Sequence, residues 1–116
     1  FTDTFAFSTT PNYSSNGAYS DVITNFSPAE GDIIKLSKTV FGISSGGLSP
    51  TFAQVSKTAD LSAQLGSGTQ IVYDKSTGFL YNNQDGFLSN GCGSNGGIFA
   101  VLTNQPTLKS SNLQFI

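Results

Sequence analysis

Polar and apolar side chains alternate in several short segments of the chain, separated by stretches rich in proline, glycine, serine and asparagine. Alternation with a period of two residues is typical of a β-strand with one buried face. The pattern predicts strands over residues 3–8, 21–26, 33–37, 70–74, 79–82, 98–102 and 113–116. Residues 98–102 are apolar throughout, which indicates a strand buried on both faces.

The connections between these strands contain the residue types of turns. Pro28 fixes one backbone angle in the segment 27–32, and Gly31 can adopt a left-handed backbone, so this segment predicts a tight turn. Residues 75–78, Lys-Ser-Thr-Gly, predict a hairpin between the strands on either side of them. Loops are expected at 11–20, 42–50 and 83–97.

Two segments have the signals of short helical turns. Ser49 and Pro50 provide an N-cap and a first helical position, which predicts a helical turn at 51–53. Leu61 and Leu65 are four residues apart, a spacing that fits one turn of helix, although a loop fits this polar stretch nearly as well.

Seven or eight short strands joined by turns predict an all-β fold. The architecture we expect is an antiparallel β-sandwich or a capped β-roll with one or two short helical turns. The 116 residues are the length of one domain, so residues 1–116 are expected to form a single β domain. We expect no transmembrane segment, because no apolar run approaches the roughly 20 residues that a membrane helix needs.

Charged residues make up only 10% of the chain, and the formal net charge is −2. With five lysines and no arginine, the chain lacks the basic surface that nucleic-acid binding requires, so no nucleic-acid partner is expected. It has no histidine, and Cys92 is its one cysteine, so it has neither an imidazole base to activate a nucleophile nor an intrachain disulfide. These absences predict a protein that is not an enzyme. Cys92 is expected to be an unpaired or intermolecular thiol.

Three segments together resemble a known family: DTFAF at 3–7, DVITNFSPAEGDIIKLS at 21–37 and IVYDKSTGFLY at 71–81. They resemble the C-terminal module that follows the glycine-rich nonapeptide repeats of hemolysin-type calcium-binding (RTX) proteins, including serralysin-like secreted proteins. The closing residues 108–116 are similar to the last strand of that module. The resemblance implies a non-catalytic, extracellular all-β module that caps a calcium-bound parallel β-roll. The repeats themselves do not occur in this chain, so preceding RTX repeats are the expected partner.

Calcium is the cofactor that the resemblance implies. The candidate ligands, which lie near the predicted turns, are Asp3, Asp21, Glu30 and Asp32. Calcium takes six to eight oxygen ligands, and these four acids supply only part of such a shell. Asn25, Lys35 and Asn112 stand where the family commonly has acids, which lowers the negative charge further. The alternative is that the acids cap turns and keep the surface soluble.

Two other functions fit the sequence. Low charge, abundant serine, threonine and asparagine, and terminal strands that can add to an open sheet edge suit a homopolymer. Such a protein would be a self-assembling subunit of a bacterial surface layer or extracellular filament, with other copies of itself as partners. The third hypothesis is a non-catalytic fragment of a secreted hydrolase. The chain begins at Phe1 rather than at a methionine, so we expect an excised domain or a processed product at the cell surface or outside the cell.

Overall fold

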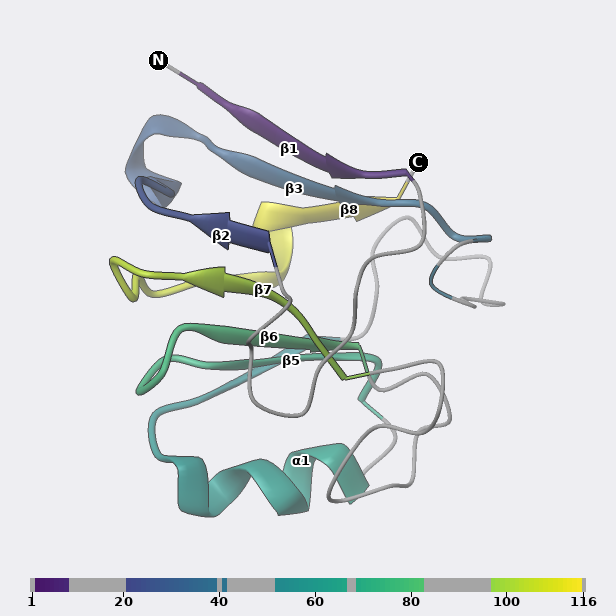
Figure 1. Cartoon of the computed structure of the whole chain (residues 1–116), viewed down its shortest axis with the longest axis vertical. Helices are drawn as coiled ribbons and strands as arrows, with labels where there is room; N and C mark the ends of the chain where they lie inside the picture. Colours follow the sequence, from purple (N-terminus) through teal and green to yellow (C-terminus); the bar gives the residue numbers. More distant parts are fainter. Residues whose placement is uncertain are drawn as a thin grey trace.

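A computed structural model of the chain describes residues 2–8, 21–39, 41, 52–66, 69–82 and 97–115. Strands are the main regular structure of this part of the chain, which confirms the all-β class expected from the alternating pattern. Its strands form two sheets, one of three strands and one of five (Figure 1). The predicted loops and Cys92 lie outside the described residues, apart from Gly97, which belongs to a strand.

The three-stranded sheet is entirely parallel. Its strands, in spatial order, are β1 (Thr4–Phe7), β3 (Ile33–Leu36) and β8 (Leu113–Phe115). Thr4 lies opposite Ile33, and Ile34 lies opposite Leu113. The expected antiparallel arrangement is therefore wrong for this sheet. The reason is topological: strands far apart in sequence pair here, and alternation within a strand carries no information on the direction of its neighbour.

The five-stranded sheet is mixed. Its strands, in spatial order, are β2 (Asp21–Ile23), β7 (Gly97–Leu102), β6 (Phe79–Asn82), β5 (Ile71–Asp74) and β4 (Phe52–Val55). The pairs β7–β6 and β6–β5 are antiparallel, and the predicted hairpin is β5–β6. The outer pairs β2–β7 and β4–β5 are parallel, so the antiparallel expectation holds only in the middle of the sheet.

Short helical segments complete the fold. They are the 3₁₀ turns η1 (Pro28–Glu30), η2 (Thr58–Asp60) and η3 (Ser110–Asn112), and the helix α1 (Leu61–Gly66). The spacing of Leu61 and Leu65 thus marked a real helix, which lies against β4 and β5 (Figure 1). The helical turn expected at 51–53 is wrong, because Phe52 and Ala53 belong to β4 and their pairing with β5 outweighs the local capping signal.

The first three strands trace one full turn of a coil. The chain runs along the three-stranded sheet in β1, crosses to the five-stranded sheet in β2, and returns in β3 beside and parallel to β1. In Figure 1, β1 and β3 run in one direction, and β2 and β7 run in the other. Coiling of this kind places consecutive passes of the chain one strand apart in each sheet.

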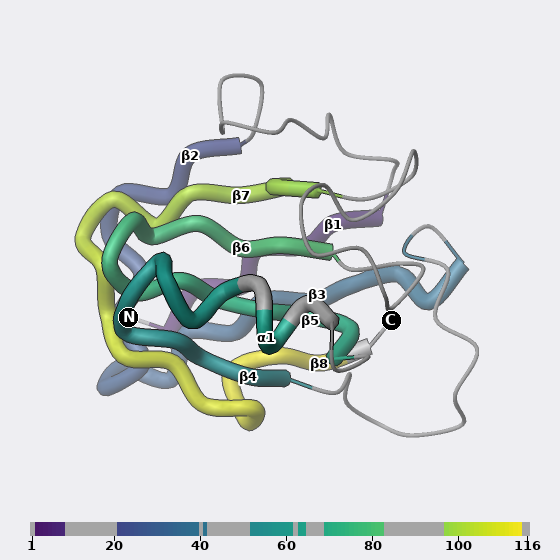
Figure 2. Tube along the Cα trace, turned by 90° about the horizontal axis from the view of Figure 1, so that it is seen from below, coloured from purple at the N-terminus to yellow at the C-terminus, as the bar shows by residue number. Residues whose placement is uncertain are grey.

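One hydrophobic core joins the two sheets. It contains Phe7, Ile34 and Leu36 from the three-stranded sheet together with Leu80 and Phe99 from the five-stranded sheet. The rings of Phe7 and Phe99 meet edge to face with centroids 5.1 Å apart. The inner faces of both sheets are therefore buried against each other, while their outer strands remain at the margin of the fold (Figure 2).

Candidate functional site

Strands β1 and β2 are the outermost strands at the same end of the molecule. Among the described strands, each has a neighbour on one side only, β3 for β1 and β7 for β2. We call these two free edges and the space between them the open end.

Within the described ranges, backbone groups at the open end lack partners in a regular pattern. The amide of Ile33 donates to the carbonyl of Asp3, and the amide of Ser37 donates to the carbonyl of Phe7. Successive residues of a strand point their backbone groups to opposite sides, so Thr4 and Ala6 direct theirs to the free edge of β1.

The same reasoning applies to β2. The amide of Thr103 donates to the carbonyl of Ile23, so the backbone groups of Val22 point to the free edge of β2.

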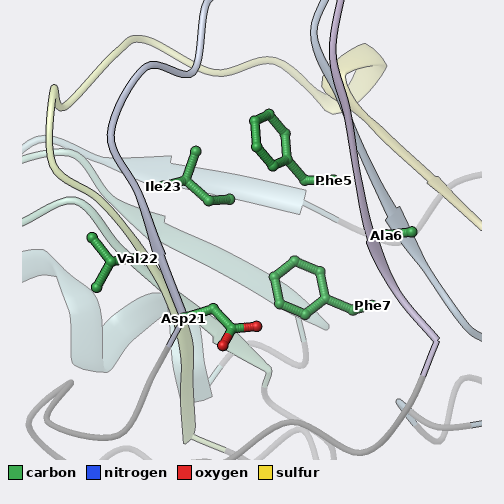
Figure 3. A pocket seen from close by; sticks show the side chains of 6 residues that line it. All are labelled: Phe5, Ala6, Phe7, Asp21, Val22 and Ile23. Carbon is green, nitrogen blue, oxygen red and sulfur yellow. The ribbon is translucent and has the colours of Figure 1, made fainter.

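A cleft of about 220 Å³ lies between the two strands (Figure 3). The residues that line it are Phe5, Ala6, Phe7, Asp21, Val22 and Ile23. Beside it, Val22 is 60% exposed and is the one large hydrophobic side chain of the described residues that is strongly exposed. The open end thus combines free strand edges with apolar surface, the two features that an added strand or a second chain can use.

Asp32 fixes the start of β1 against the rest of the fold. Its buried carboxylate accepts two backbone hydrogen bonds, from the amide of Asp3 to Oδ1 and from the amide of Ser27 to Oδ2, each at 2.8 Å. These hydrogen bonds from the Asp3 and Ser27 amides hold the pKa of Asp32 below its usual value of 3.8. The carbonyl of Asp32 also accepts a bond from Nδ2 of Asn112, which connects this corner to the segment before β8.

The sequence signal for this corner was the Pro-Ala-Glu-Gly-Asp turn. Gly31 adopts the left-handed backbone expected of it, with φ of 84°, and thereby ends η1. The hydroxyl of Thr2 donates to the carbonyl of Glu30 at 2.6 Å, so the residues before β1 contact the turn as well. Asp32 therefore performs the turn-capping role that the sequence offered as the alternative to metal binding.

The four predicted calcium ligands lie at two places. Asp3, Glu30 and Asp32 belong to the corner that starts β1, whereas Asp21 lies in β2 and lines the cleft. Within the described ranges, no three or more aspartate, glutamate, cysteine or histidine side chains come together in a group that could hold a metal ion. Both carboxylate oxygens of Asp32 are already engaged by amides. Calcium binding by these residues stays a prediction.

The cleft was not recognised from the sequence, although part of its signal was present. Asp21 and Ile23 are two residues apart in one strand and so share a face, which places an acid beside a core residue. The alternating pattern of the sequence does not show which strands become the outermost strands of the two sheets.

Comparison with known proteins gives no match among family models, curated proteins or solved structures. None of the helices in the described ranges has both the length and the apolar character needed to cross a membrane.

Proposed function

We propose that this domain is a non-catalytic extracellular module that closes one end of a parallel β-roll, as the resemblance to RTX C-terminal modules implies. The observation that supports the proposal is the coil β1–β2–β3, in which each of the first two strands has, among the described strands, a neighbour on one side only. A preceding turn of the same kind of coil would place one strand beside β1 and one beside β2. It would thereby satisfy the outward backbone groups of Thr4, Ala6 and Val22.

The opposite side of the five-stranded sheet supports the same proposal. Beyond β7 the parallel pattern ends, because β6 and β5 run antiparallel as a hairpin. The helix α1 then lies against β5 and β4. In the five-stranded sheet a coil can therefore extend from the open end but is interrupted on the far side, as a cap requires.

The proposal is tested by joining a block of glycine-rich nonapeptide repeats to the chain, in calcium, ahead of Phe1. We expect a higher melting temperature and slower hydrogen exchange at the amides of Thr4, Ala6 and Val22. The matched control carries the same block after Ile116, where these amides should not change. Equal protection in both fusions, or none in either, contradicts the proposal.

Ala6→Pro tests whether the docking uses the free edge of β1. Proline removes the amide that faces the free edge but none that pairs with β3, so the unfused chain should keep its fold. In the fusion ahead of Phe1, Ala6→Pro should abolish the gain in stability, whereas Ala6→Thr should retain it. Val22→Pro makes the same test in β2 and covers the case in which Ala6→Pro disturbs folding.

A second candidate function is self-assembly. The three-stranded sheet has β1 at one margin and β8 at the other, and both are parallel to β3. The β1 strand of one copy can therefore extend the sheet of the next copy beside β8, a head-to-tail contact that grows into a filament. Sedimentation over a range of concentrations should then show growth that deletion of residues 1–6 blocks. A monomer at the highest concentration contradicts this candidate.

A further inference from the structure

The carboxylate of Asp21 lies on the inner face of β2. Asp21 is paired with Ala100 and Ile23 with Leu102, and Ala100, Ile23 and Leu102 are all buried. Because residues i and i+2 of a strand share a face, Asp21 faces the space between the sheets. In Figure 3 its carboxylate is directed into the cleft, toward the side where Phe7 lies.

Asp21 is exposed, and the described residues around its carboxylate are apolar. Among the described residues, the others that line the cleft are Phe5, Ala6, Phe7, Val22 and Ile23, and none of these has an oxygen or nitrogen in its side chain. Within the described residues, Asp21 has neither a hydrogen bond nor an ion pair through its side chain. Lys35 lies close in the fold, opposite Ala6, but it alternates with the buried Ile34 and Leu36 and so points to the outer face of its sheet.

Asp21 is exposed in this structure, and a strand that docks beside β2 with its inner face over the cleft would remove the carboxylate from water. Burying a charge without a partner is unfavourable, so the docking strand must bring a group that compensates it. Calcium is not the group inferred here, since it requires six to eight oxygen ligands and the described residues of the cleft provide one carboxylate. A lysine or arginine does suit it, because its long apolar stem can pack on Phe7 and its cationic end can reach the carboxylate.

We infer that the open end recognises a strand with a basic side chain on its inner face, in register with Asp21. A strand that pairs with the free edge of β2 in parallel places every second side chain on that face, one strand spacing from Asp21. The inference rests on the docking proposed above and adds its chemical selectivity: the partner is cationic at one inward position and apolar at the others.

The test uses the ¹⁵N-labelled chain and synthetic nine-residue peptides in which valine and threonine alternate. The central inward valine is replaced by lysine, norleucine or glutamate, and binding is measured from shifts of the β1 and β2 amides. We expect the lysine peptide to bind about tenfold more tightly than the norleucine peptide, and the glutamate peptide to bind most weakly. The preference should decrease as salt is added.

Variants of the chain separate the outcomes. Asp21→Asn should reduce the preference for lysine over norleucine to about one, and Asp21→Lys should reverse it in favour of glutamate. Asp60→Asn, which removes an exposed acid in η2, is the control of equal charge and should change nothing. If the lysine and norleucine peptides bind equally, or if Asp21→Asn leaves the preference intact, the inference is wrong while docking stands. Shifts of the Asp21 amide with calcium alone also overturn it. If no peptide perturbs β1 or β2, docking itself fails.

Discussion

At the scale of single residues, the corner at Asp32 makes the fold dependent on pH. The hydrogen bonds from the Asp3 and Ser27 amides favour the ionised carboxylate, and they lower the pKa of Asp32 in the folded state below its usual 3.8. A carboxyl whose pKa is depressed on folding stabilises the protein above its unfolded pKa, and this contribution is lost as the pH falls through the folded value.

We therefore expect the stability of the wild-type chain to fall in acid, below the usual pKa of 3.8 that applies to the unfolded chain. Asp32→Asn should lower stability at neutral pH, because an amide offers one oxygen to the two backbone donors, and it should reduce the loss in acid. Urea unfolding between pH 2 and 7 measures both effects. Asp60→Asn, at an exposed position, serves as the control; the same pH dependence in wild type and Asp32→Asn would contradict the expectation.

Two glycines with the same backbone conformation, Gly78 and Gly31, can be compared directly at the residue scale. Both have a left-handed backbone, with φ of 81° and 84°. A Cβ at Gly78 would lie 2.2 Å from the carbonyl oxygen of Leu102, whereas one at Gly31 would be in ordinary contact with Thr2, at 3.5 Å from its hydroxyl. The carbonyl of Gly78 also accepts a hydrogen bond from the amide of Leu102 at 2.7 Å, so the two backbones cannot separate without losing it.

Gly31→Ala should cost about 1–2 kcal/mol, which is the strain of a left-handed alanine. Gly78→Ala should cost clearly more, at least about 3 kcal/mol, because a backbone clash adds to the same strain. Denaturant unfolding of both variants isolates the clash as the difference between them. Equal losses of stability in the two variants would mean that Gly78 and Leu102 are not in the close backbone contact described above.

At the scale of elements, local pairing was predictable and distant pairing was not. The hairpin β5–β6 follows from two alternating strands joined by residues that end in Gly78, all within about a dozen positions. The parallel neighbours β1 and β3 are separated by about thirty residues, and nothing in either strand specifies the other. For the same reason, the sequence indicated Asp21 and Asp32 as residues of interest but not that one lines a cleft and the other is buried under two amides.

The parallel edge makes a prediction for hydrogen exchange. In the isolated chain the amides of Phe5 and Phe7 pair with β3, while those of Thr4 and Ala6 face the free edge. We expect Thr4 and Ala6 to exchange on the order of a hundredfold faster than Phe5 and Phe7. Exchange followed by NMR at neutral pH measures the ratio. Uniform protection along β1 would show that its outer side is covered.

At the scale of the whole molecule, the two sheets depend on one core. The rings of Phe7, Phe41 and Phe99 contact one another edge to face, with centroids 5.0 to 6.2 Å apart, and join β1 to β7. The open end consists of one strand from each sheet. Its geometry therefore depends on the contact between these three rings. The proposed docking through both edges therefore requires the two sheets to fold as one cooperative unit.

Phe99→Ala tests this coupling. The substitution empties space between the sheets, and we expect a loss of about 3–5 kcal/mol. Because the core is shared, the loss should appear in a single transition that is the same for both sheets. The amide signals of β5, which contains the buried Tyr73, report on the five-stranded sheet. The amide signals of β3 report on the other sheet.

Phe79→Ala is the control and should cost less stability than Phe99→Ala, because its ring is half-buried and lies on the opposite face of β6 from Leu80. If β3 unfolds at a lower denaturant concentration than β5, the two sheets unfold separately. A partner at the open end would then have to order β1 on binding, which would weaken its affinity.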